Sequence, residues 1–176
     1  MTKDTQYHIT ITALKLKKGI DHYLKKFYDP SCAFYLFAVY WDAKGNLLDI
    51  FPKQVADAEA QQLKLAADNI RQANAINNSI FIDCTTVNAL YMMQILVELD
   101  DELAQVLENF KLLITATLDQ VADVEKYASA ITKKLHQQGN RLVLLQHKFE
   151  KQDLHKQLQL SLHSDYTELT FNITKI

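Results

Sequence analysis

The stretch that most constrains the fold runs from residue 79 to residue 119. It holds two short apolar runs, residues 80–82 and 112–114, and small polar residues follow each run at once. Between them lies a long apolar segment whose large side chains recur at steps of three and four, as in an amphipathic helix. These side chains are Met92, Leu96, Leu99, Leu103, Val106 and Phe110. The stretch therefore predicts a strand, then a helix over about 86–110, then a second strand over 111–116.

The next sixty residues extend this alternation. Apolar residues from Val121 to Leu135 step by three and four, which predicts a helix, and Gly139 stands where a left-handed residue would end it. An apolar run over 141–145 predicts a third strand. A β-α-β-α-β order over about 79–147 favours right-handed crossovers and parallel strands. We therefore expect an α/β fold, with a mixed, centrally parallel sheet and helices on both of its faces.

Antiparallel hairpins are predicted at both ends of the chain. Residues 32–51 form an aromatic run, a loop containing Gly45, and a returning strand. Residues 157–174 alternate apolar and polar side chains around a turn at Ser164. The first strand, over 7–16, changes phase at Ala13, which predicts either a bulge or a strand end near that residue. Pro52 is expected to open a further helix at its first turn. A chain of 176 residues suits one domain, so the whole chain, 1–176, is expected to be a single α/β domain.

Composition narrows the classes of function. A net charge of -2 and a pI of about 6.3 argue against a general nucleic-acid binder. The three glycines are isolated, which excludes a glycine-rich phosphate loop. Neither a signal peptide nor an apolar run of about 20 residues is visible, so we expect a cytoplasmic protein away from membranes. The two cysteines, Cys32 and Cys84, are interpreted as buried thiols.

A candidate site lies at the predicted strand ends. In open α/β sheets, ligands bind beyond the carboxyl ends of the strands, and a helix beginning near Thr86 would favour an anion there. The expected ligand-binding residues are Asp83, Thr85, Thr86, Thr115, Thr117, Asp119 and His147, with Gln146 and Lys148 beside the last. The alternative is that the threonines and aspartates cap helices and that Cys84 packs in the core.

An enzymatic version of this site would use Cys84 as nucleophile and His147 as base. No local motif supports that pair. A metal site would draw on Glu150, Asp153, His155 and His163 together with His147, but their spacing matches neither a helical pair nor a structural zinc site. We therefore predict no metal and no cofactor.

Basic residues interleaved with aromatics near the N-terminus are the strongest sign of nucleic-acid binding. They are Lys15, Lys17, Lys18, Lys25 and Lys26, with Tyr23, Phe27 and Tyr28. Such a group can hold a phosphate backbone and stack bases, but lysines also guard exposed strand edges against pairing. Only two arginines occur in the chain, so a nucleic acid is not the expected partner.

The leading hypothesis is a small interaction or regulatory protein without catalytic activity. It would act through a protein partner or by self-association, with the aromatic hairpin over 34–51 and the apolar segment over 90–97 as candidate surfaces. The alternative is a ligand-binding or hydrolytic domain that acts on an anionic small ligand, phosphorylated or a nucleotide, at the edge formed by Asp83, Thr85, Thr117 and His147.

Overall fold

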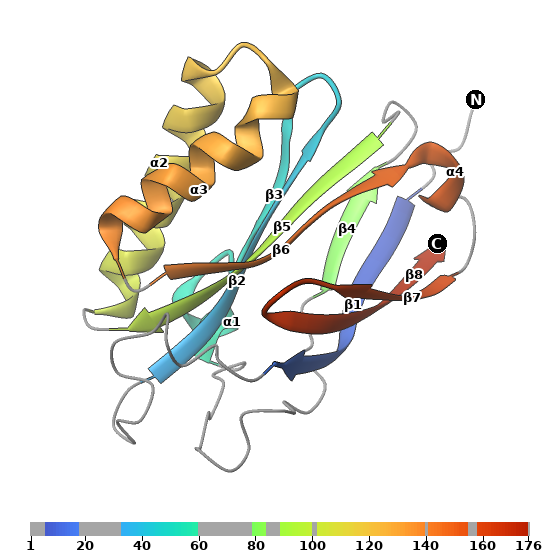
Figure 1. Ribbon diagram of the computed structural model, residues 1–176, viewed down its shortest axis with the longest axis horizontal. Coiled ribbons are helices and arrows are strands. Elements are labelled where there is room, and N and C mark those ends of the chain that lie inside the picture. The colour runs from blue at the N-terminus through green and yellow to red at the C-terminus, as the bar shows by residue number, and fades with distance from the viewer. Residues whose placement is uncertain are drawn as a thin grey trace.

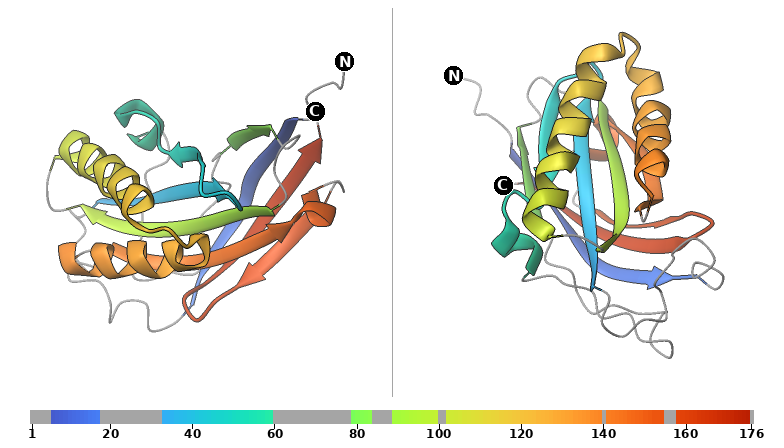
Figure 2. Two further views of the ribbon diagram at one scale, coloured as in Figure 1. Left: turned by 90° about the horizontal axis from the view of Figure 1, so that it is seen from above. Right: turned by 90° about the vertical axis from the view of Figure 1, so that its left-hand side faces the viewer.

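The structure, a computed structural model, describes residues 6–17, 33–59, 79–83, 89–99, 102–139, 141–154 and 158–175. These residues form two four-stranded sheets and a helical layer, stacked so that one sheet lies between the other sheet and the helices (Figure 1; Figure 2). Every strand pairing among them is antiparallel. The predicted α/β fold, a centrally parallel sheet with helices on both faces, is therefore wrong.

The terminal sheet is built largely from the two ends of the chain, in the order β4-β1-β8-β7. Its strands are β1 (Gln6–Leu16), β4 (Ser79–Asp83), β7 (Leu158–His163) and β8 (Thr167–Lys175). The pairing of β1 with β8 shifts register between Ile11 and Ala13, which confirms the predicted bulge. The predicted C-terminal hairpin is confirmed as β7 and β8, and its turn is closed by the Ser164 amide donating to the Thr167 carbonyl.

The central sheet has the order β3-β2-β5-β6. Its strands are β2 (Ala33–Asp42), β3 (Leu47–Phe51), β5 (Ala89–Leu99) and β6 (Arg141–Glu150). The predicted aromatic hairpin is confirmed as β2 and β3, and Gly45 takes a positive φ of 86° in its loop. The buried carboxylate of Asp42 organises that loop by accepting hydrogen bonds from the Lys44 and Asn46 amides.

The single helix predicted over about 86–110 is wrong over residues 89–99, which form a strand. Residues 89–99 form β5, which pairs with β2 on one side and β6 on the other. Its described side chains, over 89–98, are buried on both faces of the sheet. A strand buried on both faces carries an unbroken apolar run, which periodicity alone does not distinguish from a buried helix.

The helical layer begins with α2 (Leu103–Gln120). Residues 111–116, predicted to be a strand, lie inside this helix. A 3-10 turn, η2 (Val124–Lys126), leads into α3 (Tyr127–Gln138), so the helix predicted over 121–135 is confirmed but begins later. Gly139 follows with a positive φ of 69°, as predicted, but its ψ of 167° lies outside the left-handed helical region. Two short helices are α1 (Val55–Glu59), close behind Pro52, and α4 (Lys151–Leu154).

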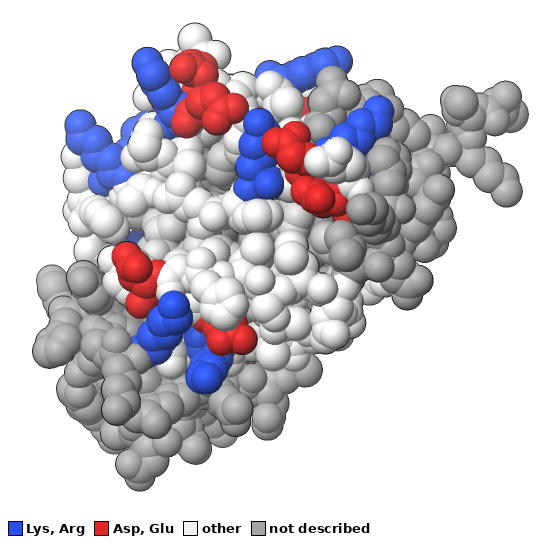
Figure 3. All heavy atoms as spheres, turned by 45° about the vertical axis from the view of Figure 1, so that its right-hand side comes forward, with Lys and Arg blue, Asp and Glu red and all other residues white. Residues whose placement is uncertain are grey.

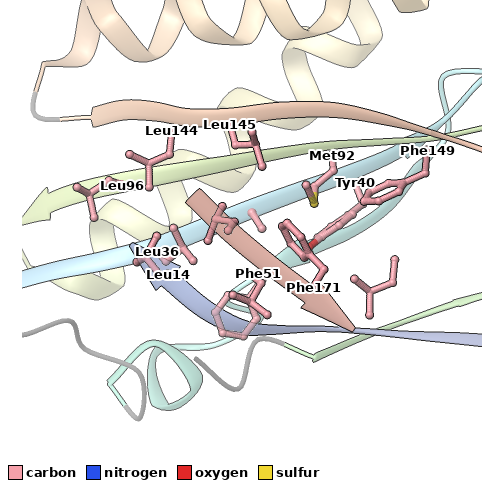
Figure 4. Packing of buried hydrophobic residues seen from close by; sticks show 14 of the residues in the cluster. Leu14, Leu36, Tyr40, Phe51, Met92, Leu96, Leu144, Leu145, Phe149 and Phe171 are labelled. Atoms are coloured by element: carbon pink, nitrogen blue, oxygen red, sulfur yellow. The ribbon is translucent and has the colours of Figure 1, made fainter. Parts of the chain in front are cut away.

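Side-chain alternation on the central sheet produces two hydrophobic cores. Even-numbered residues of β2, such as Leu36 and Tyr40, point into the core between the sheets, where Phe149 and Phe171 also pack (Figure 4). Odd-numbered residues, such as Phe37, point into a second core beneath α2 and α3. Burying a large apolar side chain contributes about 1.5–3 kcal/mol, so these two cores hold the three layers together.

Two other expectations meet the structure only in part. The candidate partner surfaces, residues 34–51 and 90–97, are mostly interior, since all described side chains over 34–42 and 90–97 are buried. Within the described ranges, no helix has the length and apolar character needed to cross a membrane. The helical spacing of Ile20, Leu24 and Phe27 predicts a short helix, which lies outside the described residues.

Candidate functional site

The predicted strand-end site rests on parallel strands that share a carboxyl edge, and that premise is wrong. Asp83 ends β4, where its backbone pairs with Gln6 at the edge of the terminal sheet. His147 lies on β6 in the central sheet, and β6 runs antiparallel to its neighbour β5. Cys84, Thr85 and Thr86 lie outside the described residues, so the Cys84–His147 pair stays a prediction.

The other three predicted residues belong to α2 rather than to a strand end. The hydroxyls of Thr115 and Thr117 donate to carbonyls one helical turn earlier, those of Lys111 and Leu113, at 2.9 and 2.6 Å. Thr117 is buried, whereas Asp119 is exposed on the last turn and caps no helix. The cap predicted there is provided instead by Asp123, whose carboxylate accepts from the Glu125 amide at the start of η2.

The structure instead offers a pocket between the helical layer and the central sheet, with a volume of about 200 Å³. One wall comes from β2, β5 and β6, and the other comes from η2 and the first turn of α3. The lining residues, called the aromatic pocket below, are Trp41, Tyr91, Met92, Val124, Glu125, Ala128, Gln146, His147 and Lys148. Of the predicted site residues and their neighbours, the pocket brings together His147, Gln146 and Lys148.

Two aromatic rings from adjacent strands lie at the inner side of the aromatic pocket. Trp41 and Tyr91 are direct cross-strand partners, and their rings stack with centroids 5.6 Å apart and planes 7° apart. Tyr127 packs against the same indole at 6.2 Å in a tilted arrangement. Trp41 is almost fully buried, and its indole N–H finds no acceptor among the described residues. A buried donor without an acceptor costs roughly 1–3 kcal/mol.

The rim of the aromatic pocket is a small charged network. The Tyr91 hydroxyl donates to the Glu125 carboxylate. The Lys148 ammonium lies 3.9 Å from Glu125, 3.5 Å from Glu150 and 5.4 Å from the centre of the Tyr91 ring. Burial and the hydrogen bond to Glu125 raise the pKa of Tyr91, and the Tyr91 hydroxyl and Glu150 raise the pKa of Lys148. Both shifts favour a protonated Tyr91 phenol and a charged Lys148 ammonium.

Acidic and basic side chains also alternate beyond the pocket. On the face drawn in Figure 3, lysine and arginine side chains lie directly beside aspartate and glutamate side chains. Of the lysines considered for nucleic-acid binding, Lys17 donates to the Ser164 carbonyl, and Lys18, Lys25 and Lys26 lie outside the described residues. Among the residues that the structure covers, no three histidine, cysteine or acidic side chains are grouped as metal ligands.

His147 is a predicted site residue in the pocket lining, but its side chain lies on the same face of β6 as Phe149, which packs between the two sheets, and so points away from the helical layer. It is half-buried, and its ring meets the edge of Phe149 at 4.6 Å. Burial lowers the pKa of His147 from its ordinary 6.5, while the negative charge of Asp153 acts in the opposite direction. At neutral pH the imidazole is therefore uncharged, with one nitrogen able to accept a hydrogen bond.

Sequence reasoning missed most of the aromatic pocket. The sequence places Trp41 and Tyr91 only within the candidate partner surfaces over 34–51 and 90–97, and it predicts a helix where Tyr91 lies in a strand. Had residues 89–99 been taken as a strand pairing with β2, the register would have placed Tyr91 directly opposite Trp41. No sequence pattern indicated a role for Glu125, which is the second residue of η2 and lies at the rim of the pocket.

Comparison with known proteins adds no assignment. The chain matches no protein family, no curated protein and no solved structure. The function must therefore be argued from the residues themselves.

Proposed function

We propose that the protein is a small cytoplasmic regulatory protein that acts by binding rather than by catalysis, with the aromatic pocket as its ligand site. The observation that carries this proposal is the unpaired indole N–H of Trp41 in the wall of that pocket. A ligand with an acceptor atom that reached this donor would remove the cost of leaving it unpaired.

The composition of the pocket wall supports the same proposal. Ligand sites are mostly apolar with a few placed polar groups, and this wall combines the apolar side chains of Val124 and Ala128 with two stacked aromatics. Glu125 and Lys148 at the rim are exposed and can change position when a ligand enters. The ion pair between them and the hydrogen bond from the Tyr91 hydroxyl to Glu125 hold the rim in place in the free protein.

Intrinsic fluorescence provides a direct test, because Trp41 is the only tryptophan in the chain. A ligand in the aromatic pocket should change Trp41 emission in a saturable way and raise the thermal midpoint in proportion to its occupancy. The matched control is Leu112→Ala on the exposed face of α2, which should bind unchanged. A small-molecule collection that raises no midpoint and alters no Trp41 emission would overturn the proposal.

Association with a protein partner or a second copy is the second candidate function. The specific observation in its favour is that Leu47 and Leu112 are exposed, Leu112 by 60%. Light scattering over a range of concentrations would show a mass that rises with concentration, and Leu112→Glu would abolish the rise. A constant monomer mass in wild type would argue against self-association. Cell fractionation would test the cytoplasmic placement.

A further inference from the structure

We infer that the aromatic pocket takes an uncharged planar heterocycle of one or two rings that carries a hydrogen-bond acceptor. This inference rests on the proposed function and adds the chemical class of the ligand. It follows from the size of the pocket, the charge of its wall and the hydrogen-bonding groups that the wall leaves available.

Size sets the first limit. About 200 Å³ is below the roughly 300–1,000 Å³ typical of drug-sized sites. A nucleotide or a peptide would not fit inside it. A single ring or a fused pair of rings would.

Charge sets the second limit. The ionised groups of the wall are Glu125 and Lys148, which lie 3.9 Å apart and offset each other. A second carboxylate, Glu150, also lies beside Lys148 at 3.5 Å. An anion would have to compete with two carboxylates for one ammonium, and an organic cation would meet Lys148 already above the Tyr91 ring. An uncharged ligand avoids both conflicts.

Hydrogen bonding sets the third limit. The indole N–H of Trp41 can only donate, so the ligand must offer an acceptor such as a ring nitrogen or a carbonyl oxygen. The Gln146 side chain donates to Thr132 at 3.3 Å, which leaves its carbonyl oxygen able to accept from the ligand. The N–H of Trp41 is covered in the free protein, so the ligand must move the side chains that cover it before its acceptor can reach this donor.

The experiment compares five probes by calorimetry and Trp41 fluorescence: adenine, nicotinamide, benzoate, tetramethylammonium and inorganic phosphate. Adenine and nicotinamide should bind, and the three charged probes should not. Trp41→Phe keeps an aromatic ring but removes the N–H, and it should weaken heterocycle binding about threefold to tenfold when followed by calorimetry. Leu112→Ala should bind as wild type does.

The outcomes separate the two proposals. If a charged probe binds and the heterocycles do not, the ligand class is wrong and the binding site stands. If Trp41→Phe binds the heterocycles as tightly as wild type, the hydrogen bond to the indole is wrong. If neither these probes nor a wider collection change Trp41 emission or release heat, the proposed function fails with the inference.

Discussion

Trp41 and Tyr91 face each other across β2 and β5 with nearly parallel rings, 5.6 Å between centroids. The pair joins the second hydrophobic core to the aromatic pocket, because both residues belong to that core and both line the pocket. Substitutions here can therefore change stability and binding separately, and the choice of replacement decides which is changed.

Tyr91 offers the clearest separation of packing from hydrogen bonding. Tyr91→Ala removes the ring stacked on Trp41 and should destabilise the fold by about 3–5 kcal/mol, as other large aromatic truncations do. Tyr91→Phe keeps the ring and loses only the hydrogen bond to Glu125, so it should cost about 0.5–1.5 kcal/mol. Urea unfolding measures both. Equal losses from the two variants would contradict the stacking described for this pair.

Two glycines with positive φ form a matched pair for a second prediction. A Cβ at Gly45 would lie 2.5 Å from the Tyr127 hydroxyl, whereas one at Gly139 would have no neighbour within 4 Å. Gly139→Ala should cost about 1–3 kcal/mol from backbone strain alone, and Gly45→Ala should cost more because of the added clash with Tyr127.

The excess cost at Gly45 should shrink when Tyr127→Phe removes the hydroxyl. A double-mutant cycle in urea unfolding measures this coupling. If Gly45→Ala and Gly139→Ala cost the same, the contact between the β2–β3 loop and α3 is absent.

A third prediction concerns a polar pair in the core between the sheets. The Gln94 side-chain amide donates to the Tyr40 hydroxyl at 3.0 Å, and the carbonyl oxygen of Gln94 has no partner among the described residues. Tyr40→Phe alone leaves the amide without its acceptor and should cost about 1–3 kcal/mol. Tyr40→Phe combined with Gln94→Leu removes both groups and should recover most of that loss. Additive losses in the double variant would contradict a direct bond.

The pH dependence of His147 is a fourth prediction. Its pKa in the folded protein lies below the ordinary 6.5, so the unfolded chain binds the proton more readily. The contribution to stability is present above pH 6.5 and is lost as the pH falls through the lowered pKa. His147→Gln should therefore reduce the loss of stability on acidification.

NMR titration of the His147 ring tests the same prediction directly. The midpoint should lie below 6.5, and Asp153→Asn should lower it further because the aspartate favours the charged ring. A midpoint above 6.5 in the wild type would contradict the burial of this side chain.

Much of the β structure could be predicted from local patterns. Alternation in β1, β7 and β8 predicted half-buried strands, and Gly45 predicted the loop of the β2–β3 hairpin. These elements follow from period-two patterning and turn chemistry, which are properties of a few adjacent residues. The helix around Ile131 was also predicted, since its apolar side chains step by three and four against a polar background.

The sheet topology could not be predicted in the same way. In β5, burial on both faces removed the alternation that identifies a strand, and the coincident spacing of Met92 and Leu96 favoured a helix. In α2, Leu112 is exposed and Leu113 only partly buried, so their apolar character favoured a strand they do not form. These two errors led to the prediction of parallel strands. That prediction in turn placed Asp83 and His147 at one edge of the sheet.

The most direct test of the account is the indole N–H resonance of Trp41, a single signal in ¹⁵N-labelled protein, followed while adenine is added. We predict that the indole proton exchanges slowly with solvent in the free protein, because the N–H is buried. We also predict that its chemical shift changes saturably as the acceptor of the ligand reaches it. An N–H that exchanges as fast as free indole and does not move with adenine would contradict the account.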